Sequence, residues 1–126
     1  MIKALGQVML YVEDQEQSVK FWTDKLGFTV ISTDELMEGY RSVEVAAGKN
    51  SETSIVIFDK AFIKKYSPEL NLGTPSLMFK ADNIDELYEE YQKKGINVGE
   101  KSEYPFGKVF NFSDDEGNYF AVSNEA

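Results

Sequence analysis

Two residue types that this chain lacks set the first limit on its chemistry. The 126 residues contain no histidine and no cysteine. Histidine is the commonest transition-metal ligand and the side chain whose pKa best suits proton transfer near neutral pH, and cysteine supplies the thiolates of many zinc sites. Most zinc, nickel and non-haem iron sites are therefore improbable, and disulfides are excluded, which favours a reducing cytoplasm.

The remaining groups that could act as acid, base or anion clamp are scattered along the chain: Tyr11, Tyr40, Arg41, Glu44, Lys80 and Tyr119. No spacing pairs any of them as a nucleophile with its base, so the sequence singles out no catalytic residue. The densest run of oxygen ligands is Asp114-Asp115-Glu116, and Mg²⁺ or Ca²⁺ can be bound by oxygen alone. Because Asp is common in turns, we favour an exposed hairpin turn there.

The amino-acid composition limits the classes of molecule that the protein is expected to bind. The net charge is −9, and the 13 Lys and Arg residues form no dense cluster, which disfavours nucleic acid. The longest apolar runs, such as residues 54–58, are far too short to cross a membrane, and nothing near Met1 resembles a signal peptide. We expect no nucleic-acid or membrane partner; the acidic surface serves solubility and mildly favours a cationic ligand.

The elements that must position any site occur twice. In the first half, a period-two strand over residues 7–12 precedes a helix that Asp14 caps and Gly27 ends. Strands are predicted over residues 28–33, 40–46 and 53–58. After a stretch containing Phe62 and Tyr66, a strand over residues 76–81 and a helix between Asn83 and Gly95 repeat the order. The final strands are expected over residues 96–98, 108–112 and 118–123.

The two halves match at a nearly constant offset, which indicates an internal duplication. The offset is 69 residues between Val8 and Leu77 and 68 residues between Gly27 and Gly95. We therefore predict an α+β fold of two tandem βαβββ modules that form a curled mixed sheet with helices on its convex face. One domain is expected over residues 1–126, with a first module at about 4–60, a connecting segment at 61–73 and a second module at about 74–124.

Several motifs in this order resemble the vicinal oxygen chelate superfamily. The motifs are Tyr11-Val12-Glu13-Asp14 with Ser18, Phe21-Trp22 and Leu26-Gly27-Phe28, then Asp82-Asn83-Ile84-Asp85 with Lys94-Gly95-Ile96, and Phe112-Ser113-Asp114-Asp115-Glu116-Gly117-Asn118. The superfamily includes glyoxalase I, bleomycin-resistance proteins, fosfomycin-resistance enzymes and extradiol dioxygenases. The last run resembles the family's aromatic-x-Asp-Pro-Asp-Gly-Asn signature, with Asp115 and Glu116 in place of Pro and Asp. The resemblance spans nearly the whole chain.

The resemblance also locates the family's metal-ligand positions. In metal-dependent members a ligand, usually His, starts the first strand of each module, and a ligand, usually Glu, lies on the last strand of each module. These positions fall on Gln7, Val56, Ser76 and Ala121 in this chain. None is a good ligand, so the resemblance points to the metal-free, bleomycin-resistance-like branch, with no metal and no cofactor.

Strand alternation from Gln7 and Ser76 then predicts the lining of a ligand cavity. The expected lining residues are Gln7, Met9, Tyr11, Val56, Phe58, Ser76, Met78, Asn111, Tyr119 and Ala121. The residues expected to pack under the helices are Val8, Leu10, Ile55, Ile57, Leu77, Phe79, Phe110, Phe112, Phe120 and Val122. An aromatic and methionine-rich lining suits an apolar or planar molecule, although such residues also fill collapsed cores.

We therefore expect a metal-free protein that sequesters an apolar, planar or cationic small molecule, and the resemblance implies a homodimer. The alternative is an enzyme: a glyoxalase-like lyase or isomerase that uses a side-chain acid or base, or one with an oxygen-ligated metal. We favour binding over catalysis because the family's ligand positions are occupied by other residues.

Overall fold

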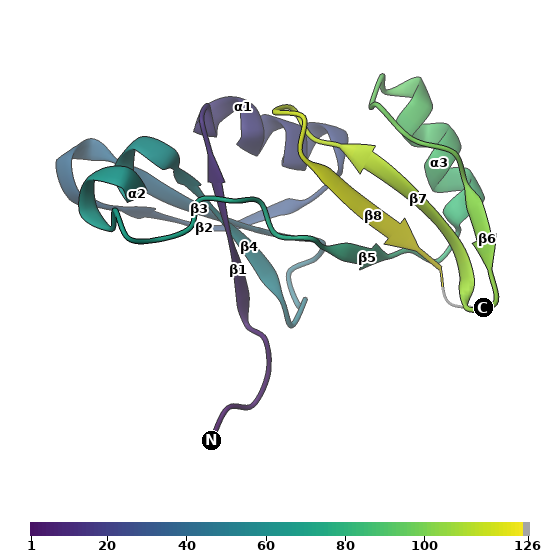
Figure 1. Cartoon of the computed structure of the whole chain (residues 1–126), viewed down its shortest axis with the longest axis horizontal. Helices are drawn as coiled ribbons and strands as arrows, with labels where there is room; N and C mark the ends of the chain where they lie inside the picture. The colour runs from purple at the N-terminus through teal and green to yellow at the C-terminus, as the bar shows by residue number, and fades with distance from the viewer. Residues whose placement is uncertain (125–126) are drawn as a thin grey trace. The chain divides into compact units, whose positions relative to one another are not determined.

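The computed structural model of the protein describes residues 1–124 and contains two compact units, Met1–Thr74 and a second that begins at Pro75. Each unit is a four-stranded mixed sheet with helical structure against one face (Figure 1). The predicted α+β fold of two tandem βαβββ modules is confirmed. A single domain over the whole chain stays a prediction.

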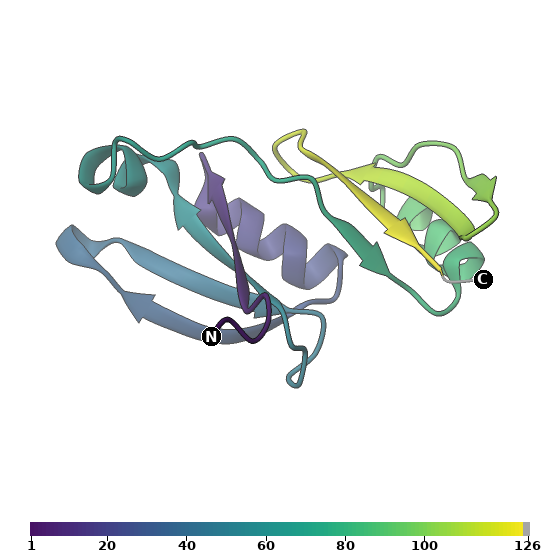
Figure 2. The same cartoon turned by 60° about the horizontal axis from the view of Figure 1, so that its bottom comes forward.

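The first unit begins with strand β1 (Gln7–Val12) and helix α1 (Gln15–Lys20), which continues as a π-helical turn (Phe21–Lys25). Strands β2 (Thr29–Glu35), β3 (Arg41–Ala46) and β4 (Ser54–Asp59) follow, with a short 3-10 turn (Met37–Gly39) between β2 and β3, and helix α2 (Lys60–Tyr66) comes last. The strand order is β1-β4-β3-β2, with β1 parallel to β4 and the other pairs antiparallel. Figure 2 shows α1 lying along one face of this sheet.

The second unit repeats this plan. Its elements are β5 (Met78–Lys80), α3 (Ile84–Lys93), β6 (Ser102–Tyr104), β7 (Gly107–Ser113) and β8 (Tyr119–Ser123). The strand order is β5-β8-β7-β6, again with the first strand parallel to the last and the other pairs antiparallel. The same strand order in both sheets agrees with the duplication inferred from the sequence.

Local signals in the sequence fix both equivalent helices. The Asp14 carboxylate accepts a hydrogen bond from the Gln17 backbone N–H at 3.1 Å, and the Asn83 side chain accepts one from Glu86 N–H at 3.2 Å. Gly27 and Gly95, the predicted stops, both have φ of 77°. Within residues 1–124, no helix is both long enough and apolar enough to span a membrane.

The residues predicted to pack under the helices do form the core. Leu10, Ile55, Ile57, Phe110, Phe112, Phe120 and Val122 are buried, and Val8, Leu77 and Phe79 are half-buried. In the first unit, Trp22 is fully buried and meets Phe28 edge-on at 5.1 Å between ring centroids. In the second unit, Tyr91 of α3 meets Phe110 and Phe112 edge-on. This burial raises the pKa of Tyr91 to about 12.

Two segments differ from the prediction. Residues 61–73, expected as a connecting segment, include most of α2, which Asp59 caps by accepting from Ala61 N–H at 2.8 Å. Burial of Phe62 and Ile63 stabilises this short helix, and that contact could not be read from local propensity. The strand expected over residues 96–98 is reduced to one bridge between Val98 and Phe112, and β7 instead pairs with the unpredicted strand β6.

The turn between β6 and β7 requires glycine at position 107. Gly107 has φ of 135°, and a Cβ there would overlap the backbone carbonyl of Asn124. Gly107→Ala should therefore lower the free energy of unfolding by at least about 2 kcal/mol. Urea denaturation measures the loss, with Gly6→Ala as control because nothing lies within 4 Å of a Cβ there. Equal stability of the two variants would contradict this account.

An ion cluster joins α3 to Lys101, directly before β6, and to Lys108 of β7. The Asp85 carboxylate lies 2.8 Å from Lys101 Nζ and 2.9 Å from Lys108 Nζ, and these contacts lower its pKa from 3.8 to about 2. A lowered folded-state pKa stabilises the fold above the unfolded value and loses that effect as pH falls through the folded value. Asp85→Asn should thus be less stable than the native chain near neutrality. Thermal melts should show the difference in melting temperature between the two proteins disappearing as the pH falls from 3.8 to about 2. A difference that does not depend on pH would show that the Asp85 ion cluster is not its cause.

Candidate functional site

The sheet of the first unit has an open face, opposite the face that packs on α1. Pairing of β1, β4 and β3 places side chains there in three rows. The rows are Gln7 with Ser54, then Met9 with Val56 and Glu44, then Tyr11 with Phe58 and Ser42. We call these eight residues the first open face. It contains all five cavity residues predicted for the first module.

Glu44 lies at the centre of the polar part of this face. Its Oε2 accepts hydrogen bonds from the Ser54 hydroxyl at 2.5 Å and from Gln7 Nε2 at 3.2 Å. Its Oε1 accepts one from the Ser32 hydroxyl at 3.1 Å, and Ser32 pairs with Glu44 across β2 and β3. Three strands therefore hold one carboxylate in a fixed orientation.

These donors keep Glu44 ionised. The hydrogen bond from Ser54 is the largest cause of the lowered pKa, followed by that from Gln7. Burial opposes them with a smaller effect than either, and the Ser32 bond lowers the pKa least. The donors are all uncharged. Within residues 1–124, no Lys or Arg forms an ion pair with Glu44.

The carboxylate borders an open hollow of about 450 Å³ within the first unit. Gln7, Glu44 and Ser54 line it together with Ile31, Ala46 and the loop that joins β3 to β4. That loop contributes Lys49 and Glu52. A hollow of this volume can hold a small-molecule ligand.

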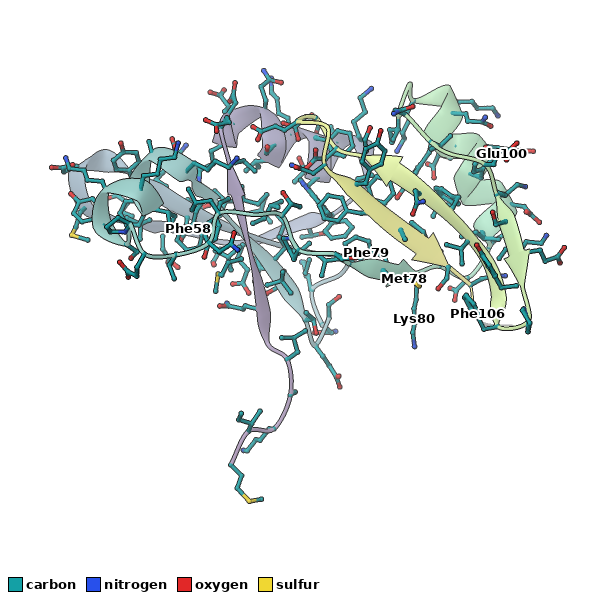
Figure 3. The ribbon with its side chains drawn as sticks, viewed as in Figure 1. Phe58, Met78, Phe79, Lys80, Glu100 and Phe106 are labelled. Carbon is teal, nitrogen blue, oxygen red and sulfur yellow. The ribbon has the colours of Figure 1, made fainter. Side chains whose placement is uncertain are left out.

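Aromatic side chains occupy the opposite end of the same face. Tyr11 and Phe58 have ring centroids 6.0 Å apart, and Phe58 is nearly coplanar with Phe62 of α2 at 6.4 Å. Phe62 in turn contacts Tyr40 at 5.4 Å and Tyr66 at 4.9 Å. Figure 3 shows Phe58 near α2. The first open face is thus polar and anionic at one end and aromatic at the other.

The second sheet has a matching open face, opposite α3. Met78, Ala121 and Asn111 form one row across β5, β8 and β7, and Tyr119 pairs with Ser113 in the next. Met78 and Tyr119 are 56% and 65% exposed, and Figure 3 shows Met78 and Lys80 projecting away from β5. Ser76 is exposed and precedes β5. The second module's five predicted cavity residues therefore lie on or beside this face, but among residues 1–124 it has no carboxylate equivalent to Glu44.

The four positions that the resemblance assigns to metal ligands have different surroundings in the structure. Gln7 donates to Glu44, and Val56 is buried. Ser76 is exposed and Ala121 is half-buried. No group of three or more Asp and Glu residues in the described chain, residues 1–124, is arranged to hold a metal ion.

The acidic run Asp114-Asp115-Glu116 forms the turn between β7 and β8. The buried Asp114 carboxylate accepts from the backbone N–H groups of Glu116 and Asn118 at 2.9 and 2.8 Å and from Asn118 Nδ2 at 3.1 Å. The turn is confirmed, but Asp114 is buried rather than exposed, because its carboxylate accepts the turn's own hydrogen bonds.

The prediction of site residues omitted Ser32 and Ser54 and placed Glu44 only among scattered acid or base candidates. A signal for Glu44 was present: it alternates with the buried Val43 and Val45, which assigns it to the open face. Its partners could not be found in this way, because they depend on the register of three strands and on the irregular pairing between Val30 and Ser32.

Comparisons with known proteins extend over almost the full chain. The model of the Glyoxalase/Bleomycin resistance protein/Dioxygenase superfamily matches residues 4–122. The uncharacterized protein YetH of Bacillus subtilis (strain 168) is 36% identical over 123 residues, which cover 97% of this chain and 98% of YetH. The antibiotic binding protein TnmS3 from Streptomyces sp. CB03234 has a TM-score of 0.83 and 25% identity, covering 99% of this chain and 98% of TnmS3. A glyoxalase/bleomycin resistance protein from the same strain has a TM-score of 0.75 and 26% identity, covering 95% and 99%.

The hydrogen bonds to Glu44 generate a prediction about its titration. Ser54→Ala removes the donor that contributes most to the lowered pKa, so the pKa of Glu44 should rise toward 4.5. NMR titration of the Glu44 side-chain carboxyl measures it. Ser42→Ala is the matched control, because Ser42 lies on the same strand and face but does not bond to Glu44. An unchanged pKa in Ser54→Ala, or an equal rise in the control, would show that the Ser54 hydroxyl does not set it.

Proposed function

Because the chain belongs to the glyoxalase/bleomycin resistance protein/dioxygenase superfamily, we propose that it binds a small molecule reversibly and releases it unchanged. The observation that carries this proposal is the replacement of all four family ligand positions by Gln7, Val56, Ser76 and Ala121. Without a metal to polarise an oxygen, the enolate and oxyanion chemistry of metal-dependent relatives has no electrophile. The description of TnmS3 as an antibiotic binding protein supports ligand binding as a function of this fold.

The first open face supports a planar or apolar ligand. Tyr11 and Phe58 offer ring surfaces, and Met9, which is 37% exposed, offers a flexible thioether in the neighbouring row, which also contains Glu44. Aromatic and methionine side chains bind apolar molecules of varied shape. The lowered pKa of Glu44 supports binding over general-base catalysis, because a base with a pKa far below neutrality is a poor proton acceptor.

Equilibrium binding tests this proposal. The native chain should bind planar aromatic molecules saturably below millimolar concentration, and chromatography should recover the ligand unchanged. Met9→Lys should weaken binding at least about tenfold, because it places a long cationic side chain in the middle row of the first open face. Met37→Lys is the control, since Met37 is 54% exposed in the turn between β2 and β3. Chemical conversion of the ligand, or no binding to the native chain, would contradict the proposal.

We further propose that the protein holds no resident transition metal. Inductively coupled plasma mass spectrometry of protein purified without chelators should find less than stoichiometric zinc, nickel, iron and manganese. A stoichiometric transition metal that survives dialysis would instead favour the enzymatic alternative.

A homodimer is also part of the proposal. Met78 and Tyr119 both expose apolar surface on the second open face, and exposed apolar surface is a feature of many interfaces. Light scattering coupled to size exclusion should give twice the mass of one 14.3 kDa chain; a monomer at high concentration would refute this part alone.

A further inference from the structure

We propose that the first open face takes a planar organic cation, whose charged group binds Glu44 and whose ring system lies over Met9, Val56 and Phe58. This inference rests on the small-molecule-binding function proposed above and adds the charge and shape of the ligand. It assigns to Glu44, a residue outside the four family ligand positions, the role of determining ligand specificity.

The hydrogen bonds of Glu44 leave room for one more donor. A carboxylate has about four acceptor sites, two on each oxygen. Oε2 already accepts from Ser54 and Gln7, whereas Oε1 accepts only from Ser32. The second site on Oε1 is therefore open to an N–H group of a ligand. Because Ser32, Ser54 and Gln7 fix the carboxylate beforehand, little conformational entropy is lost when the ligand binds.

The negative charge of Glu44 favours a cationic donor at this open site. The three donors are neutral, so they orient the negative charge of Glu44 without cancelling it, and their effect on its pKa keeps the charge present at neutral pH. Lys49 and Glu52 are the charged residues that line the same hollow from the loop between β3 and β4. In the part of the chain that is described, Lys49 forms no ion pair with Glu44, and Glu52 carries the same negative charge as Glu44.

Spacing on the sheet sets the shape of the ligand. Met9 and Val56 share the row of Glu44, and Phe58 lies one row further along β4. Residues two apart on a strand are separated by about 7 Å, which is close to the width of a fused aromatic ring system. A flat cation anchored at Glu44 would therefore extend over the methionine and valine to the ring of Phe58, where aromatic and cation–π contacts add affinity.

A pair of planar tricyclic probes separates charge from shape. Dissociation constants of 9-aminoacridine, a cation at neutral pH, and of neutral acridone are measured by fluorescence titration. Glu44→Gln keeps the side-chain size and removes the charge. It should weaken 9-aminoacridine binding at least about tenfold and change acridone binding less than about twofold. Glu89→Gln removes the same charge from an exposed position on α3 and should leave both constants unchanged.

Measurements on the native chain cover the case in which Glu44→Gln does not fold. Rising NaCl should weaken 9-aminoacridine binding and spare acridone, because salt screens only the charged contact. Acidification should abolish the preference for the cation only when Glu44 is protonated, below the ordinary carboxyl pKa.

The outcomes separate this inference from the function on which it rests. Equal affinity of the native chain for both probes, or full retention of 9-aminoacridine by folded Glu44→Gln, would overturn the cation assignment and leave small-molecule binding intact. Failure of the native chain to bind either probe at millimolar concentration would overturn both.

Discussion

Strand alternation is the constraint on which the rest of this structure depends. Successive side chains of a strand point to opposite faces, so helix α1 can cover Leu10, Val12 and Ile57 only if Met9 and Glu44 lie on the other side. A shift of one residue in register would bury Glu44 and expose the core. The need to bury one apolar face thus also determines which residues lie on the open face, where we propose that the ligand binds.

Within that open face, Glu44 offers an oriented negative charge, on which the proposed binding function relies in place of a metal. The Gln7 position, which holds a ligand in metal-dependent relatives, here supplies an amide that hydrogen-bonds a carboxylate on another strand. Together with two serine hydroxyls it holds the carboxylate ionised and oriented. A neutral donor set of this kind leaves the negative charge available to a ligand, whereas a lysine or arginine partner would neutralise it.

The sequence predicted the fold well because its signals are local and are repeated. Asp14 and Asn83 cap equivalent helices, Gly27 and Gly95 end them, and period-two patterns mark most of the strands. Helix α2 was missed because burial of its side chains stabilises it more than its own propensity. The cluster around Glu44 was missed because it joins β1, β2, β3 and β4, whose register no local pattern encodes.

A crystal structure of the protein with 9-aminoacridine is the most direct test of the proposed complex. We expect the exocyclic amine or ring N–H within hydrogen-bonding distance of Glu44 Oε1, with the ring plane over Met9 and Val56. A ligand bound elsewhere, with the Glu44 carboxylate unoccupied or paired with Lys49, would contradict the central claim that this carboxylate is held ready for a cation.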